Sequence, residues 1–251
     1  MREFNIFRRH GKQYVPDLQQ AELPPLFRGR PVISQDVTPE EASRLAAICP
    51  VTAIGTEPCS IDLGRCVFCK ECEFELPGKI RFTHDYKMAT NFPEGLIVIQ
   101  GREEQIELKP EKIRAEIQGF FRQALKLRQV SAGGDNSAEM ELNAAGNVNF
   151  DMGRFGIEFV ASPRHADGIV ITGPVTGNMA PALQICYDAI PSPKIVILAG
   201  TDAISGGIFR DSPALNREFL KIYHVDLFIP GNPPHPLTFI NGVLDLIKKR
   251  S

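Results

Sequence analysis

The residues best suited to metal chemistry in this chain are cysteines, and most of them lie close together. The chain has six cysteines, and all but Cys186 lie between Cys49 and Cys72. Cys66, Cys69 and Cys72 follow the spacing C-x2-C-x2-C, which brings three thiols to one loop. Thiolates at such spacings bind iron–sulfur clusters or zinc. The pattern therefore predicts a metal centre, with buried structural cysteines as the alternative.

The residues around this triplet favour one of the two metals. In the bacterial ferredoxin run C-x2-C-x2-C-x3-C-P, the last cysteine serves the other of two clusters. Here Leu76 occupies that position directly before Pro77, and an isolated Cys49-Pro50 stands upstream. One ligand set is thus complete and the other is missing. The pattern predicts a single [4Fe-4S] cluster, rather than zinc, on Cys49, Cys66, Cys69 and Cys72.

On these cysteines, residues 31–90 resemble bacterial-type ferredoxins, in particular those associated with hydrogenases and complex I. The resemblance implies a small ferredoxin-like α+β domain. Cys59 fits no ligand position, and Cys186 lies in a stretch that is predicted to be helical. We expect both to be free thiols that fill apolar space.

The second half of the chain, about 113–248, resembles the small subunit of membrane-bound [NiFe] hydrogenases and the homologous cluster-bearing subunit of respiratory complex I. The stretches that carry the resemblance are 151–167, 172–183, 187–194 and 230–234. The resemblance implies a flavodoxin-like parallel α/β domain docked on a large catalytic subunit.

At four positions the chain departs from that family. The family holds a proximal [4Fe-4S] cluster on loops that read D-A-G-S-C-N-G-C-E, G-D-C-A and P-G-C-P-P. At the four cysteine positions this chain has Asp135, Ala138, Asp202 and Asn232. Because these side chains are not a normal ligand set for iron–sulfur clusters, we expect that cluster to be absent and the residues to line a vacated pocket.

Oxygen donors could instead hold a hard cation in that pocket, although simple hydration of the pocket is the plainer interpretation. Two carboxylates in one pocket repel each other, so a base or water should separate them. Arg164 and His165 are the candidate bases; the alternatives for them are a subunit interface or a solvated turn.

Composition and charge exclude several classes of protein. The 251 residues suit one large or two modest domains, and 43% are hydrophobic. A net charge of −2 gives no reason to expect nucleic acid or an anionic membrane as a partner. No apolar run approaches the roughly 18 residues of a membrane span, and the charged N-terminus lacks a signal-peptide core. We therefore expect a cytoplasmic protein that reaches the inner face of a membrane only through partners.

The remaining pattern predicts the elements that position these residues. We expect an extended arm over 1–30, the ferredoxin-like domain over 31–90, a strand and linker helix over 91–128, and the α/β domain over 129–251. A helix is predicted over 39–49, with Thr38 as N-cap and Glu41 as the capping-box acid.

Apolar runs alternate with helical patterns in the second half, which predicts a parallel sheet. The predicted strands of this half are 157–160, 167–172, 194–199 and 225–230, and its predicted helices are 179–190, 213–223 and 236–249. In the bridge before it we expect a strand over 95–100 and a helix over 111–127.

Two functions fit these features. The first is an iron–sulfur electron-transfer subunit, not catalytic alone, whose partners are a large hydrogenase-like or complex I-like subunit, other assembly subunits and a redox protein or cofactor. The second is a structural or redox-sensing subunit that has lost the electron relay to the large subunit.

Overall fold

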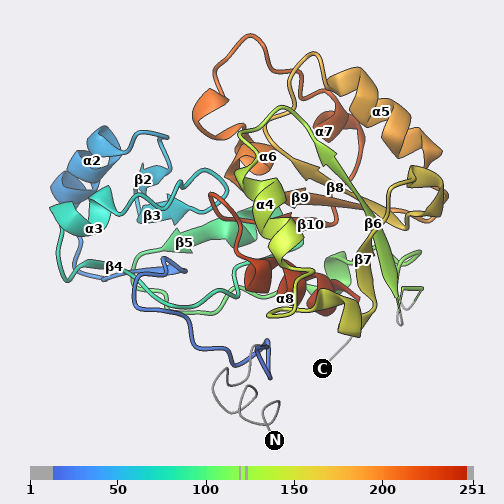
Figure 1. Ribbon diagram of the computed structural model, residues 1–251. Helices are drawn as coiled ribbons and strands as arrows, with labels where there is room; N and C mark the ends of the chain where they lie inside the picture. Colours follow the sequence, from blue (N-terminus) through green and yellow to red (C-terminus); the bar gives the residue numbers. More distant parts are fainter. Residues whose placement is uncertain (1–13, 119, 122–123, 248–251) are drawn as a thin grey trace, which may run out of the picture.

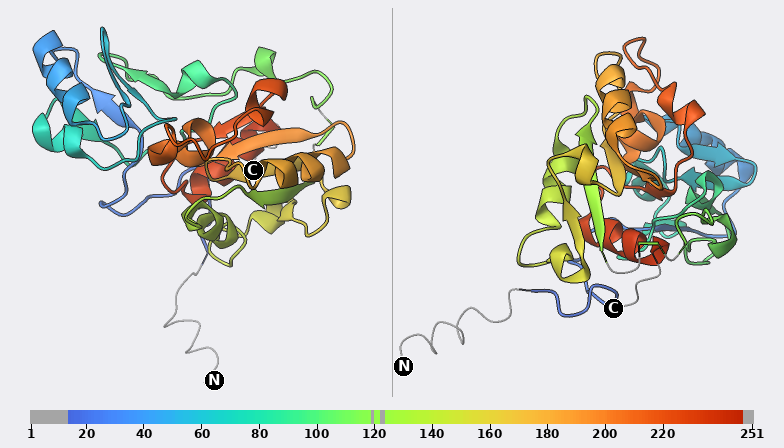
Figure 2. Two further views of the ribbon diagram at one scale, coloured as in Figure 1. Left: turned by 90° about the horizontal axis from the view of Figure 1, so that it is seen from above. Right: turned by 90° about the vertical axis from the view of Figure 1, so that its right-hand side faces the viewer.

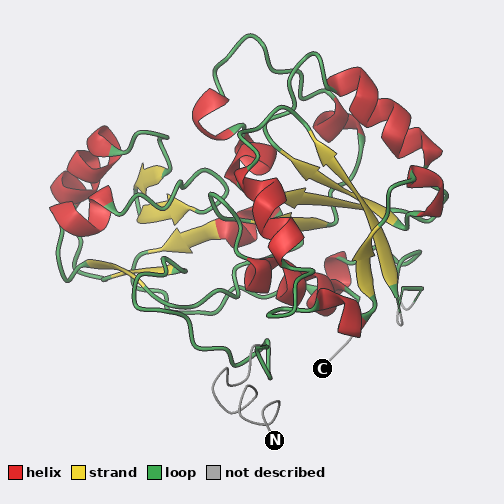
Figure 3. Ribbon diagram, in the orientation of Figure 1, coloured by secondary structure: helices red, strands yellow, loops and turns green. Residues whose placement is uncertain are grey.

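The computed structural model describes residues 14–118, 120–121 and 124–247. Two parts lie side by side: a small part on antiparallel sheets and a larger part on one parallel sheet (Figures 1 and 3). The small part contains β1 (Pro31–Ile33), α2 (Pro39–Ile48), β2 (Ile54–Thr56), β3 (Cys59–Asp62), α3 (Glu71–Glu75), β4 (Ile80–Phe82), η1 (Pro93–Leu96) and β5 (Ile97–Ile99). Strand β1 pairs with β4, and β3 pairs with both β2 and β5, all antiparallel.

The start of α2 follows the predicted capping box. The Thr38 hydroxyl accepts the Glu41 N–H at 3.3 Å, and the Glu41 carboxylate accepts the Thr38 N–H at 2.9 Å. Pro39 occupies the first turn, where its missing N–H costs nothing. The helix ends at Ile48, so Cys49 emerges directly from its last turn. The predicted helix over 39–49 is confirmed.

The larger part is an α/β layer structure. Its elements are β6 (Leu125–Ser131), α4 (Ser137–Ala144), η3 (Met152–Phe155), β7 (Ile157–Phe159), η4 (Pro163–His165), β8 (Gly168–Thr172), α5 (Ala180–Ala189), β9 (Ile195–Ala199), α6 (Thr201–Ser205), η5 (Gly207–Phe209), α7 (Phe219–Ile222), β10 (Leu227–Ile229) and α8 (Pro236–Leu246). The five strands are all parallel, in the order β10-β9-β8-β6-β7. This is the flavodoxin-like order, which confirms the predicted fold class.

Helices cover both faces of the parallel sheet (Figure 2). Side chains of α4 and α8 pack in one core, whereas α5, α6 and α7 contribute to another. Strands β8 and β9 are buried at every residue, as their unbroken apolar runs predict. No helix within the described ranges is long and apolar enough to cross a membrane.

The predicted linker helix over 111–127 is wrong. The segment begins with the single turn η2 (Pro110–Lys112), and its end belongs to β6, which lies between β8 and the edge strand β7 of the larger sheet. Ile113, Ile117 and Phe121 are buried in the same core as β6, and the described residues between them are turns rather than a helix. Their spacing therefore reflects packing against the sheet rather than helical periodicity.

The predicted helix over 213–223 is reduced to α7, Phe219–Ile222. The residues before it pair with the loop that follows β8: Leu215 forms a bridge with Thr176, and the Asn216 N–H donates to the Val175 carbonyl at 2.9 Å. These contacts take the backbone hydrogen bonds that a helix would need.

The described part of the arm, residues 14–30, packs along both parts of the molecule. Leu18 is 1% exposed within the core of the larger part. Its carbonyl accepts the Tyr86 hydroxyl at 2.9 Å and the Asn241 side-chain amide at 2.9 Å. Residues 1–13 of the predicted arm lie outside the described residues.

The arm should contribute measurably to stability through Leu18. Leu18→Ala is expected to lower the free energy of unfolding by about 2–5 kcal/mol because it empties a buried site. Leu26→Ala is the matched control on the same arm, since Leu26 is 90% exposed. Urea unfolding measures both. Equal effects of the two substitutions would mean that the arm does not hold the core.

Candidate metal centre and the adjoining cavity

The four cysteines that the sequence predicts as ligands line one cavity of the small part. Cys49 follows α2, Cys66 and Cys69 lie in the loop before α3, and Cys72 lies within α3. Cys66 and Cys72 are each 8% exposed. Elements from two places in the sequence thus deliver four thiols to the same space, and this donor set fits a thiolate-bound iron–sulfur group.

The backbone near the thiols has unusual dihedral angles and donates hydrogen bonds to two of the sulfurs. Thr52, Phe68 and Lys70 all have positive φ, a conformation that non-glycine residues rarely adopt and that occurs often at functional sites. The Ala53 N–H donates to Cys49 Sγ at 3.2 Å, and the Phe68 N–H donates to Cys66 Sγ at 3.3 Å. Such N–H···S contacts are among the features that set the reduction potential of iron–sulfur clusters.

The thiols have little tendency to ionise without a cation. Burial raises the pKa of Cys66 and of Cys72 to about 12, and neighbouring thiols add to both shifts. Thiolate ligands therefore need the positive charge of a bound metal, and metal binding must release protons from these groups.

The sulfur atoms are not arranged around a single ion. Among the described residues, no three His, Cys, Asp or Glu side chains are placed to share one metal ion. In a four-iron cluster each thiolate binds a different iron, so the ligands surround a larger group than one zinc ion.

The two remaining cysteines lie elsewhere. Cys59 is fully buried in β3, where burial raises the pKa of its thiol. Cys186 lies in α5 on the larger part and is partly buried. Neither of them lines the cavity of the other four.

A second cavity lies at the carboxyl ends of the parallel strands. Its lining includes all four residues of the predicted pocket, namely Asp135, Ala138, Asp202 and Asn232. The loops after β6 and β8 meet closely here, because a Cβ on Gly173 would lie 2.5 Å from the Gly134 nitrogen. This is the position at which open α/β sheets gather ligands.

The carboxylates of this second cavity have unequal surroundings. Asp135 accepts the Ser137 N–H at 2.9 Å and the Ser137 hydroxyl at 2.6 Å, and these bonds lower the pKa of Asp135. Burial, followed by the charges of Asp135 and Glu139, raises the pKa of Asp202. One carboxylate oxygen of Asp202 is buried without a hydrogen-bond partner among the described residues.

The predicted neighbours of these carboxylates are elsewhere. Arg164 and His165 lie in η4, which precedes the amino end of β8, whereas the cavity lies beyond its carboxyl end. Arg164 and His165 were candidate bases only if their loop lay close to the pocket, and that condition is not met, because η4 lies at the opposite ends of the strands.

Thr201 connects the two cavities, and sequence reasoning missed it. It lines the second cavity, and its hydroxyl lies 3.0 Å from the Cys66 carbonyl oxygen and 3.2 Å from the Gly231 carbonyl oxygen. Arg28 was missed as well; its guanidinium donates to the Phe68 carbonyl at 2.7 Å. The only signal for Thr201 is its place beside Asp202 in the segment that matches G-D-C-A.

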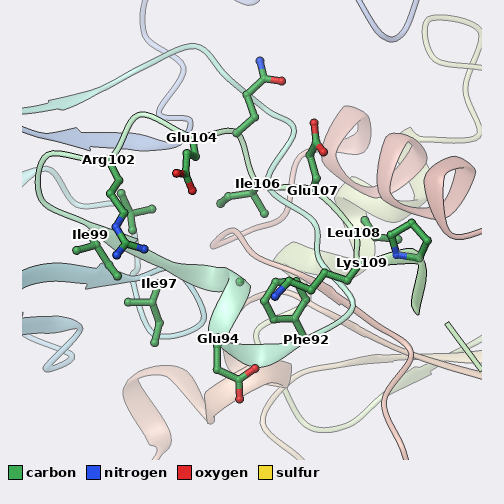
Figure 4. A pocket seen from close by; sticks show the side chains of 14 residues that line it. Phe92, Glu94, Ile97, Ile99, Arg102, Glu104, Ile106, Glu107, Leu108 and Lys109 are labelled. Carbon is green, nitrogen blue, oxygen red and sulfur yellow. The ribbon is translucent and has the colours of Figure 1, made fainter. Parts of the chain in front are cut away.

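A larger hollow, about 510 Å³, is lined by residues of β5 and of the segment 104–110 that follows it (Figure 4). None of the four clustered cysteines lines this hollow. Phe92 stands at its base, with the Lys109 ammonium 4.3 Å from the ring centroid. Isoleucines and charged side chains of both signs, such as Arg102 and Glu104, line the hollow. No cysteine is among the lining residues.

Comparisons with known proteins match the larger part. The family model "NADH ubiquinone oxidoreductase, 20 Kd subunit" matches residues 136–246. A probable membrane-bound hydrogenase subunit mbhJ of Pyrococcus furiosus is 37% identical over 139 residues, which is 55% of this chain and 83% of that protein.

Two further relatives match a shorter stretch. An NADH-quinone oxidoreductase subunit of Heliobacterium modesticaldum is 45% identical over 111 residues, 44% of this chain and 63% of that protein. An F(420)H(2) dehydrogenase subunit of Methanosarcina mazei is 43% identical over 110 residues, 44% of this chain and 60% of that protein. The chain thus spans less than two thirds of the length of these two relatives.

Asp202 should destabilise the fold at neutral pH. Its raised pKa means that the folded state favours the protonated form, so its favourable contribution is complete below the unfolded pKa and is lost as pH rises through the folded pKa. Asp202→Asn should therefore raise the urea midpoint at pH 7, and the gain should shrink towards pH 4. Asp211→Asn, at a side chain 88% exposed, controls for the lost charge. A gain that is independent of pH would contradict this account.

Proposed function

The chain belongs to the family of the NADH ubiquinone oxidoreductase 20 Kd subunit, and from this we propose that it is an iron–sulfur electron-transfer subunit of a hydrogenase-like or complex I-like assembly. The bound group is one [4Fe-4S] cluster, held by Cys49, Cys66, Cys69 and Cys72. Its relatives carry names of hydrogenase, NADH-quinone oxidoreductase and F(420)H(2) dehydrogenase subunits. This chain would work inside such an assembly rather than as an enzyme alone.

The observation that carries the proposal is the convergence of four thiols on one cavity. A cluster held by these cysteines would supply one-electron transfer between a reduced donor and an oxidised acceptor. The chain's own part is to hold the four thiolates, exclude water with the apolar residues of the small part, and direct the N–H groups of Ala53 and Phe68 at two of the sulfurs.

The partners follow from family membership and from the second cavity. A large hydrogenase-like or complex I-like subunit, further assembly subunits, and a redox protein or cofactor would supply and remove the electron. The link from Cys66 through Thr201 leads to the cavity of Asp135 and Asp202. This cavity stands where the resemblance implies a proximal cluster, but its lining has no cysteine, so either another cofactor bridges the gap or the electron leaves by another route. Contact with the inner face of a membrane would be indirect, through these partners.

A second function, a structural or redox-sensing subunit, is favoured by that same cavity. Without thiolates at Asp135, Ala138, Asp202 and Asn232, the larger part offers no soft-ligand site for a relay. The cluster would then stabilise the small part or report the redox state of the assembly.

Iron analysis tests the ligand set. Anaerobically purified or reconstituted protein should bind about four irons per chain and give the EPR signal of a reduced cluster after dithionite. Cys72→Ala should lose most of this iron, whereas Cys59→Ser should keep it, because Cys59 lies outside the cavity. A count near eight, or loss of iron in Cys59→Ser, would overturn the assignment.

Restoring cysteines tests whether the second cavity is a vacated cluster site. A variant with Asp135→Cys, Ala138→Cys, Asp202→Cys and Asn232→Cys should bind about four further irons on reconstitution and add a second reduced-cluster signal. The three-cysteine variant that keeps Asn232 is the matched control for added thiols. Two clusters in the unaltered chain would instead show a complete electron path.

A further inference from the structure

The loop that follows Cys66 is held from outside the small part by two residues that are distant in sequence. Thr201, at the start of α6, places its hydroxyl 3.0 Å from the Cys66 carbonyl oxygen in a buried position. Arg28, on the arm, donates from Nη1 to the Phe68 carbonyl at 2.7 Å. Two peptide groups of the cysteine loop are therefore fixed by the larger part and by the arm.

Fixing these carbonyls also fixes the N–H groups behind them. The peptides between Cys66 and Cys69 are trans, since the cis bonds of the described chain are elsewhere. In a trans peptide the N–H points opposite to the carbonyl. The N–H groups of Val67 and Cys69 thus point away from Thr201 and Arg28, which do not line the cysteine cavity. Neither N–H has a hydrogen-bond partner within the described residues.

Between these two amides lies a third that contacts sulfur directly. The Phe68 N–H donates to Cys66 Sγ at 3.3 Å, and Phe68 is held at φ 55° with a side chain that is 6% exposed. Successive N–H groups that turn to one side through a left-handed residue form a concavity that stabilises negative charge. The left-handed Phe68 gives this loop the backbone turn that such a concavity needs, and the loop lines the cavity in which four thiolates would add negative charge.

We propose that Thr201 and Arg28 are positioning residues that raise the reduction potential of the cluster on the four cysteines, by holding these amides towards it. The inference rests on the proposed function. A reduced cluster carries one more negative charge, so oriented N–H dipoles stabilise it more than the oxidised form. Arg28 adds a positive charge that has no carboxylate partner among the ion pairs of the described residues.

The contact between Thr201 and Cys66 also connects the reduction potential of the cluster to the second cavity. The Thr201 hydroxyl is shared between the Cys66 and Gly231 carbonyls, and the Thr201 N–H donates to Gly231 at 2.9 Å. Gly231 precedes Asn232, which lines the second cavity. A change in that loop therefore alters how well Thr201 holds the cysteine loop.

The test is an anaerobic redox titration of the reconstituted full chain, followed by the EPR signal of the reduced cluster, with iron content measured on every sample. Thr201→Val removes the hydroxyl at constant shape, and Thr201→Ser restores it. Arg28→Gln removes the charge from an exposed side chain, so folding is not at risk, and Arg28→Lys keeps the charge. Arg81→Gln, at an exposed residue of β4, controls for the loss of one positive charge.

With about four irons retained, Thr201→Val and Arg28→Gln should each lower the reduced-to-oxidised ratio about tenfold at a fixed applied potential, a fall of about 59 mV for one electron. Thr201→Ser, Arg28→Lys and Arg81→Gln should stay near the parent value. Unchanged potentials in both Thr201→Val and Arg28→Gln, beside a normal cluster in the parent, would overturn this inference alone. Absence of a cluster from the parent chain would overturn the proposed function and this inference with it.

Discussion

The hydrogen bond between the Thr201 hydroxyl and the Cys66 carbonyl is the contact on which the arrangement of both cavities depends. It is buried, and it joins residues that are 135 positions apart. A buried carbonyl without a partner is costly, so the cysteine loop needs a donor at this point. The larger part supplies it from the start of α6, where the parallel strands also end. The small part is seated there further by Ile204 and Phe228, which pack against its core.

Which elements the sequence could predict depends on how local their causes are. The capping box fixes the start of α2 within four residues, and β8 and β9 are short apolar runs rich in β-branched residues, which favours buried strands. The helix predicted over 111–127 was wrong because buried residues at helical spacing can also arise where a chain crosses a sheet. Its end alternates between buried and exposed residues in β6, and that strand signal was too short to outweigh the apparent stripe.

The residues of the candidate site likewise include some that local sequence features predict and some that they do not. The spacing of Cys66, Cys69 and Cys72 places three thiols on one loop, the isolated Cys49-Pro50 predicts a fourth, and all four line one cavity. The clustering of Asp135, Asp202 and Asn232 was predictable, because carboxyl ends of parallel strands share one edge. Thr201 and Arg28 could not be predicted, because their contacts form only when segments that are distant in sequence meet. A threonine or an arginine in a sequence does not by itself indicate a hydrogen bond to a backbone carbonyl.

The second cavity keeps its shape by hydrogen bonds that involve no metal. Asp135 accepts the amide and hydroxyl of Ser137 at the start of α4, and Thr201 closes the loops after β9 and β10. Asp135 therefore has a role in the loop itself that needs no metal. Asp202 makes no comparable gain, because one of its oxygens is buried without a partner. Asp202 is the neighbour of Thr201 in the chain, so this unpartnered carboxylate oxygen belongs to the residue next to the one that holds the Cys66 carbonyl.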